Sequence, residues 1–139
     1  MSIEGDRIMF EGSCLCGAVR YALSAEPGPI IKCHCRKCRK ASGTAFATNA
    51  LVERKDFTLQ AGQEALAEYE STPGVFRVFC RHCASPLYSR RPHEPERIRL
   101  RIGTLDTPIA ARPTAHIFVE SKAEWDEICD DLPQYAQRP

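Results

Sequence analysis

Eight cysteines in a chain of 139 residues constrain the fold and chemistry of this protein more than any other sequence feature. Seven of them form three tight motifs, CLC at 14–16, CHCRKC at 33–38 and CRHC at 80–83, and Cys129 stands alone. Disulfide frameworks belong to secreted proteins, and the N-terminal stretch lacks the apolar run of a signal peptide. We therefore expect a cytoplasmic protein whose thiols bind metal or take part in catalysis.

The composition narrows the range of partners. The net charge is only +1, so we expect no nucleic-acid partner. No apolar run approaches the ~20 residues that cross a bilayer, so we expect no membrane partner either. The length and the 43% hydrophobic content suit a single domain over residues 1–139.

Alternation of apolar and polar residues predicts mostly β-strands. In the clearest segment, Ile98 and Leu100 alternate with Arg97, Arg99 and Arg101, and we expect these arginines to face solvent. The other strands predicted in this way lie at 18–24, 75–80 and 116–121, with weaker candidates at 45–52 and 56–62.

One helix is predicted, at 122–131 (KAEWDEICDD), with Ser121 as its N-cap and Glu124 three residues later. Trp125 and Cys129 would lie on its buried stripe. The predicted fold class is therefore mainly β, with antiparallel sheets, metal-clamped turns and a short C-terminal helix.

The two outer motifs predict a closed metal site. CRHC is a usual zinc half-site, and CLC supplies the obvious second pair. The four proposed ligands are Cys14, Cys16, Cys80 and Cys83. Four thiolates leave no coordination position open, so a zinc ion here would be structural; the alternative is a set of buried free thiols.

The middle motif offers Cys33, Cys35 and Cys38 to a second zinc ion, with a fourth position open as in catalytic sites. Three thiolates make a soft, electron-rich site that favours a soft fourth ligand, such as a substrate thiol. The alternative is a site closed by a fourth protein ligand, for which Cys129 is available. An open site can also lose its metal.

Basic residues surround the middle motif and make an anionic thiol the expected substrate. The candidates for substrate binding are Arg36, Lys37, Arg39 and Lys40. The sequence indicates the roles of the histidines less clearly. His34 would point away from the flanking cysteines in an extended segment, so a supporting or surface position is favoured over ligation. His82 is expected to be exposed and His93 to lie in a loop, whereas His116 suits either the core or a pocket wall.

Five motifs occur in a fixed order: GSCLCGAVRY, CHCRKCRKASG, FRVFCRHCASPLYSR, RIGTLD and HIFVESKAEWDEI, the last followed by DDLPQY. Together they resemble the glutathione-dependent formaldehyde-activating enzyme (GFA) family, whose domain also occurs in a centromere-associated protein of animals. The resemblance covers about residues 11–135. The family often has glycine where this chain has Ala84; a positive φ there would strain alanine by about 1 kcal/mol.

The resemblance implies a β-tent fold of antiparallel sheets. It also implies a structural zinc on the outer motifs and a catalytic zinc on the middle one. The implied activity is that of a carbon–sulfur lyase, which adds glutathione to formaldehyde and gives S-hydroxymethylglutathione.

Two other hypotheses stay open from the residues alone. In the first, both metal sites are structural and the domain is a binding module without catalysis. In the second, Cys33, Cys35 and Cys38 are free thiols of a redox sensor or thiol carrier, with one zinc per chain.

Overall fold

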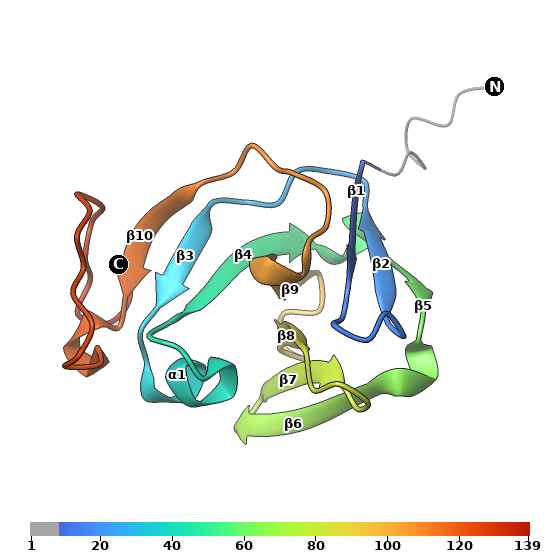
Figure 1. The fold of residues 1–139 in the computed structure, drawn as a ribbon, viewed down its shortest axis with the longest axis horizontal. Coiled ribbons are helices and arrows are strands. Elements are labelled where there is room, and N and C mark those ends of the chain that lie inside the picture. The colour runs from blue at the N-terminus through green and yellow to red at the C-terminus, as the bar shows by residue number, and fades with distance from the viewer. Residues whose placement is uncertain (1–8) are drawn as a thin grey trace.

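The computed structural model describes residues 9–139 as two β-sheets with one α-helix among them (Figure 1). The predicted absence of a signal peptide concerns in part residues 1–8, which lie outside the described residues. Between Met9 and Pro139, no helix is long and apolar enough to cross a membrane.

The smaller sheet has three strands, in the order β1 (Phe10–Ser13), β2 (Arg20–Leu23) and β5 (Phe57–Ala61). The larger has seven, in the order β10 (Pro113–Ile117), β3 (Ile30–Cys33), β4 (Ala47–Glu53), β9 (Arg97–Arg101), β8 (Pro86–Arg90), β7 (Val75–Cys80) and β6 (Leu66–Thr72). Short 3-10 turns follow several strands: η2 (Arg54–Asp56), η3 (Gln63–Ala65), η4 (Ile102–Thr104) and η5 (Val119–Ser121).

The mainly β prediction is confirmed, with one refinement of topology. Every strand pair is antiparallel except β10 with β3, which run parallel, so the large sheet is mixed. Most strands predicted from alternation are present, as β2, β4, β5, β7 and β9. The prediction at 116–121 was largely wrong, because only His116 and Ile117 lie in a strand (β10) and Val119–Ser121 form η5.

Alternation along the strands gives the large sheet two different faces. Ile98, Leu100 and Val78 are buried in the main core, which includes Tyr21 and Leu23 of the small sheet. The ring of Phe57 stacks on Tyr21 at 5.2 Å and meets Tyr88 edge-on at 5.4 Å, joining the two sheets. Residues of the opposite parity, Arg99 among them, line a cavity instead.

The predicted helix at 122–131 is wrong, because this segment is irregular and its Trp125 and Cys129 are exposed. The chain beyond it runs beside β10, as Figure 1 shows at the C-terminus. There the amide of His116 donates to Pro133, and the amide of Tyr135 donates to His116, both at 2.9 Å. Backbone pairing with a sheet edge therefore outweighs a weak amphipathic pattern.

The α-helix of the described chain is α1 (Arg36–Ser42), within the middle cysteine motif. Its N-cap is Cys35, whose sulfur accepts a hydrogen bond from the amide of Cys38. Gly43 ends the helix in the left-handed conformation, at φ 69°. Cysteine is not among the residues that usually cap the N-terminus of a helix, which explains why α1 was not predicted from the sequence.

Gly62 is expected to be intolerant of any side chain. It has φ +93°, and a Cβ there would lie 2.4 Å from the carbonyl oxygen of Ala18. We expect Gly62→Ala to lower the free energy of unfolding by about 2–4 kcal/mol, because backbone strain adds to a clash with main-chain atoms. Urea unfolding measures this loss.

Gly74→Ala is the matched control, since Gly74 also has a positive φ but open space around its Cβ position. It should cost only about 1 kcal/mol. Equal losses in the two variants would show that the contact with Ala18 does not matter.

Candidate metal centres

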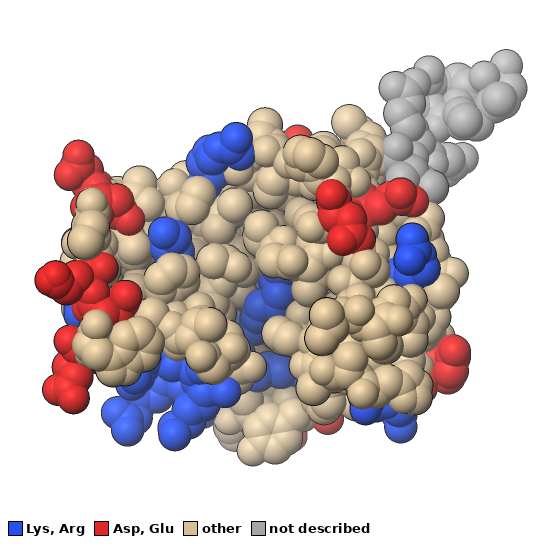
Figure 2. All heavy atoms as spheres, in the orientation of Figure 1, with Lys and Arg blue, Asp and Glu red and all other residues tan. Residues whose placement is uncertain are grey.

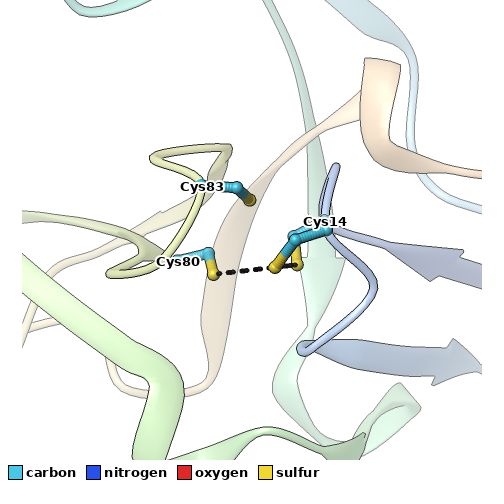
Figure 3. A group of neighbouring side chains, drawn as sticks. Cys14, Cys80 and Cys83 are labelled. Carbon is cyan, nitrogen blue, oxygen red and sulfur yellow. Dashed lines mark hydrogen bonds between the residues drawn. The ribbon is translucent and has the colours of Figure 1, made fainter.

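The outer cysteine motifs meet where the two sheets meet. Cys14 and Cys16 lie in the β1–β2 connection, Cys80 ends β7, and Cys83 lies in the turn before β8. Their sulfurs all lie within 4.8 Å of one another, as predicted from the motifs. Figure 3 shows Cys80 and Cys83 approaching from one turn and Cys14 from the opposite loop.

The sulfur spacing fits a tetrahedral zinc ion. Four sulfurs at ~2.3 Å from a central ion would stand about 3.8 Å apart. The Cys14 and Cys16 sulfurs are 3.6 Å apart, and those of Cys16 and Cys80 are 3.8 Å apart. The four thiols, with no other ligand, therefore suit a closed ZnS₄ site.

Hydrogen bonds hold these sulfurs in place. The amide of Val19 donates to the Cys14 sulfur at 3.2 Å, and that of His82 to the Cys80 sulfur at 3.4 Å. The hydroxyl of Ser85 accepts from the amide of Leu15 at 2.8 Å, which links the two turns directly. Its hydrogen bond with Cys83 lowers the pKa of that thiol to about 5, toward the thiolate that metal binding needs.

Ala84 has φ 66°, as expected if glycine is the easier residue at this position. Its amide donates to the carbonyl of Cys80 at 2.8 Å and closes the knuckle. The strain of about 1 kcal/mol is thus built into the turn that carries Cys83. His82 is exposed, as predicted, and His93 lies exposed in the loop before β9.

The middle motif brings three thiols together at the junction of β3 and α1. Cys33 ends β3, Cys35 caps α1 and Cys38 lies in its first turn, and their sulfurs lie within 4.8 Å of one another. Cys33 and Cys38 are buried, whereas Cys35 is partly exposed. Hydrogen bonds with Cys33 and Cys38, together with the charge of Arg77, lower the pKa of Cys35. The group can hold one metal ion on three sulfurs.

Cys129 does not complete this group. Its thiol is exposed, and its hydrogen bond goes to the carbonyl of Glu127. The interpretation of Cys129 as a buried apolar residue was wrong, because the helix that would have buried it does not form.

His34 is buried and supports the middle motif rather than lying at the surface. Its Nε2 lies 2.8 Å from His116 Nδ1, and His116 Nε2 lies 3.0 Å from both carboxylate oxygens of Asp130. His116 is therefore a hydrogen-bonded core residue. This chain of contacts fixes the backbone between Cys33 and Cys35 from behind.

A cavity of ≈ 780 Å³ opens beside the three thiols, and Cys33, Cys35 and Cys38 form part of its wall. We call it the basic cavity, because seven of its lining residues are cations and only Glu120 is acidic. The cations are Arg36, Lys37, Arg77, Arg91, Arg99, Arg101 and Arg138. Figure 2 shows Lys and Arg side chains gathered over the region of α1 and recessed in a hollow at the centre of this face.

Only some of the residues in the wall of the basic cavity were predicted from the sequence. Of the four residues predicted to bind substrate, Arg36 and Lys37 line the basic cavity, whereas Arg39 and Lys40 do not. The expectation that the β9 arginines face solvent holds for Arg97, which is exposed, but not for the other two.

The register of the sheet explains why Arg99 and Arg101 of β9 line the basic cavity instead of facing solvent. Arg101 pairs with Asn49 and Arg99 with Leu51, so the polar face of β9 turns toward the thiols instead of toward bulk water. Burial lowers the pKa of Arg101 to about 10, and that of Arg91 is lowered by burial and by the neighbouring charges of Arg99 and Arg138. Crowded cations of this kind favour an anion among them.

Two buried polar atoms in the wall have no protein partner among the described residues, the side-chain oxygen of Asn49 and Nη1 of Arg77. An unpaired buried group of this kind is destabilising by about 1–3 kcal/mol. Asn49 and Arg77 both line the basic cavity, so this wall carries polar groups that the described residues leave unsatisfied.

Comparison with known proteins agrees with the geometry. The model of the glutathione-dependent formaldehyde-activating enzyme family matches residues 9–121. A protein of Halomonas elongata that carries the family's name is 35% identical over 130 residues, which is 87% of this chain and 82% of that protein. An uncharacterised lyase of Schizosaccharomyces pombe is 28% identical over 79 residues, covering 57% of this chain and 56% of that one.

A solved structure shares the fold. The crystal structure of a Rhodobacter sphaeroides protein superposes with a TM-score of 0.59 at 25% sequence identity, over 72% of this chain and 91% of that chain. The family match covers most of the chain and includes all three cysteine motifs. This chain belongs to the glutathione-dependent formaldehyde-activating enzyme family.

Proposed function

We propose that this chain is a zinc-dependent carbon–sulfur lyase that joins glutathione to formaldehyde or separates the adduct. The observation that carries the proposal is the position of the three-thiol group in the wall of a cavity lined by seven cations. Family membership supports it, since the relatives carry names of this activity.

We propose zinc at both cysteine groups, two ions per chain. The four sulfurs of Cys14, Cys16, Cys80 and Cys83 would hold the structural ion. Cys33, Cys35 and Cys38 would hold the second, which supplies an open position for a substrate sulfur. All eight thiols are free, which suits a reducing compartment such as the cytoplasm, and we propose that residues 1–139 work as one domain.

The cavity suits glutathione in charge and size. Glutathione is a flexible tripeptide with two carboxylates, one ammonium group and a central thiol. Arginine forks such as those of Arg91 and Arg99 bind carboxylates in a bidentate way. Glu120, on the same wall, is available to the ammonium group. Carboxylates held at the arginines would leave the thiol free to reach the three-sulfur group.

The chain's part in the reaction is to orient and to stabilise charge. The glutathione thiol would give its proton to water, and its sulfur would add to the carbonyl carbon. The carbonyl oxygen would gain negative charge and then take a proton back from water. Arg77, which donates from Nη2 to the Cys38 sulfur at 3.8 Å, lies beside this charge. Proximity contributes further, because both reactants are held in one cavity.

Serine substitutions separate the catalytic group from the structural one. Cys35→Ser should abolish activity and change the melting temperature by less than about 4 °C, because serine keeps the N-cap of α1. Cys83→Ser should lower the melting temperature by about 10 °C or more, because the structural site contributes directly to folding. Thermal unfolding and the rate of S-hydroxymethylglutathione formation are measured on both proteins.

A Cys35→Ser variant that unfolds as readily as Cys83→Ser would overturn the catalytic assignment. Two purely structural sites would remain, and the domain would then be a binding module.

The arginines should select for carboxylates on the thiol. We expect Arg91→Met to lower kcat/KM for glutathione about tenfold or more and to leave the reaction of 2-mercaptoethanol nearly unchanged, since one charge-assisted contact is lost. Arg97→Met is the control, because Arg97 is exposed, pairs with Glu53 and lies outside the cavity. Equal losses for both thiols in Arg91→Met would exclude carboxylate recognition at this position.

A further inference from the structure

A second cavity, of ≈ 970 Å³, opens on the other side of Cys38. We call it the apolar cavity, since its wall is mostly alanine, aromatic and aliphatic side chains. These residues are Ala41, Ala45, Phe46, Ala47, Tyr69, Val78, Phe79, Ala84, Pro86 and Tyr88. Its lining includes no acidic residue, and its only cations are Arg77 and Arg101.

The two cavities meet at the middle cysteine motif. Cys38, Arg77 and Arg101 belong to the walls of both. The cations of the apolar cavity are therefore confined to the junction, and the remainder of its wall is apolar apart from uncharged hydroxyls. These belong to Ser42, Thr44, Thr48, Ser85 and Thr104. A charged reactant suits the basic side and an apolar reactant the other.

Arg77 is positioned to donate a hydrogen bond to an oxygen atom at this junction. Its Nε donates to the hydroxyl of Ser71 at 3.0 Å, and its Nη2 donates to the Cys38 sulfur at 3.8 Å. Its Nη1 is buried and has no partner among residues 9–139. The guanidinium is thus fixed on two sides, and Arg77 lies in the walls of both cavities beside the Cys38 sulfur.

We propose that the apolar cavity binds the hydrocarbon chain of an aldehyde larger than formaldehyde, with its carbonyl oxygen accepting a hydrogen bond from the guanidinium of Arg77. The proposal rests on the function proposed above and names the class of its second substrate: an uncharged aliphatic aldehyde of several carbons. Formaldehyde has no chain and would leave the apolar wall in contact with water.

The step is an addition without change of redox state. The thiol first gives its proton to water. The thiolate sulfur then forms a bond to the carbonyl carbon, the carbon–oxygen π bond breaks with its electron pair going to oxygen, and the proton returns from water to that oxygen. The product is a hemithioacetal. The reverse step returns the same atoms.

Exchange NMR measures this reaction above its uncatalysed background. The rate of interconversion between free aldehyde and glutathione adduct is compared with and without enzyme for formaldehyde, propanal and hexanal. The ratio of the enzymatic to the uncatalysed rate constant should rise about two- to fourfold per methylene added between propanal and hexanal, as expected for burial of apolar surface. Arg77→Gln should slow all three about a hundredfold, through loss of a donor to the developing oxyanion.

Ala41→Trp tests the location, since Ala41 is an exposed α1 residue that lines the apolar cavity only. The indole should remove the advantage of hexanal over propanal. Thr58→Trp is the matched control, because Thr58 is exposed on β5 and lines neither cavity.

A binding readout that needs no turnover accompanies these rates. Saturation-transfer NMR with 1-hexanol should show contact of its methylene protons with the wild-type protein and with Thr58→Trp, but not with Ala41→Trp. Absence of contact with the wild-type protein would overturn the inference.

The outcomes separate the two proposals. Acceleration with formaldehyde but none of the predicted rise toward hexanal keeps the proposed function and overturns the inference. Acceleration with hexanal alone supports the inference and corrects the aldehyde in the proposed function. No acceleration with any aldehyde overturns both.

Discussion

The four sulfurs of the outer motifs meet at the place where the small sheet joins the large one, and the remaining architecture depends on that meeting. Cys14 and Cys16 come from the β1–β2 loop, and Cys80 and Cys83 from the β7–β8 turn. A metal ion at their centre would tie segments more than sixty residues apart in the chain. The turn it fixes begins at the end of β7, the strand that carries Arg77 to the second thiol group.

The alternation of side chains along each strand gives the two faces of the large sheet different roles. Ile98 and Leu100 of β9 pack in the core beneath the small sheet, and Arg99 and Arg101 of the same strand line the basic cavity. The same register aligns Arg101 with Asn49, whose side-chain oxygen is buried and has no partner within residues 9–139. One strand pattern thus supplies both stability and a cationic wall beside three thiols.

Local sequence patterns predicted the cysteine groups and several strands. They could not predict the contacts between residues that lie far apart in the chain. Spacing alone grouped the seven cysteines into two sets, and alternation located β2, β7 and β9. The alternation of apolar and polar residues could not tell whether the polar face of β9 meets bulk water or a cavity, because that depends on how the sheet curves around α1. The helix predicted at 122–131 failed for a related reason: the last residues gain more from backbone hydrogen bonds to β10, and from Asp130 bound to His116, than a short isolated helix provides. Nothing in the sequence indicated the contact between His34 and His116, which lie 82 residues apart.

The central claim is that Cys33, Cys35 and Cys38 hold a metal ion whose fourth position accepts a thiol. The most direct test is zinc analysis combined with zinc K-edge X-ray absorption, on protein purified without chelators, before and after addition of glutathione. We expect two zinc ions per chain and a mean sulfur coordination that rises from about 3.5 to about four with glutathione, but not with serine. Two zinc ions whose spectrum ignores glutathione, or a single zinc per chain that added zinc does not raise to two, would contradict this.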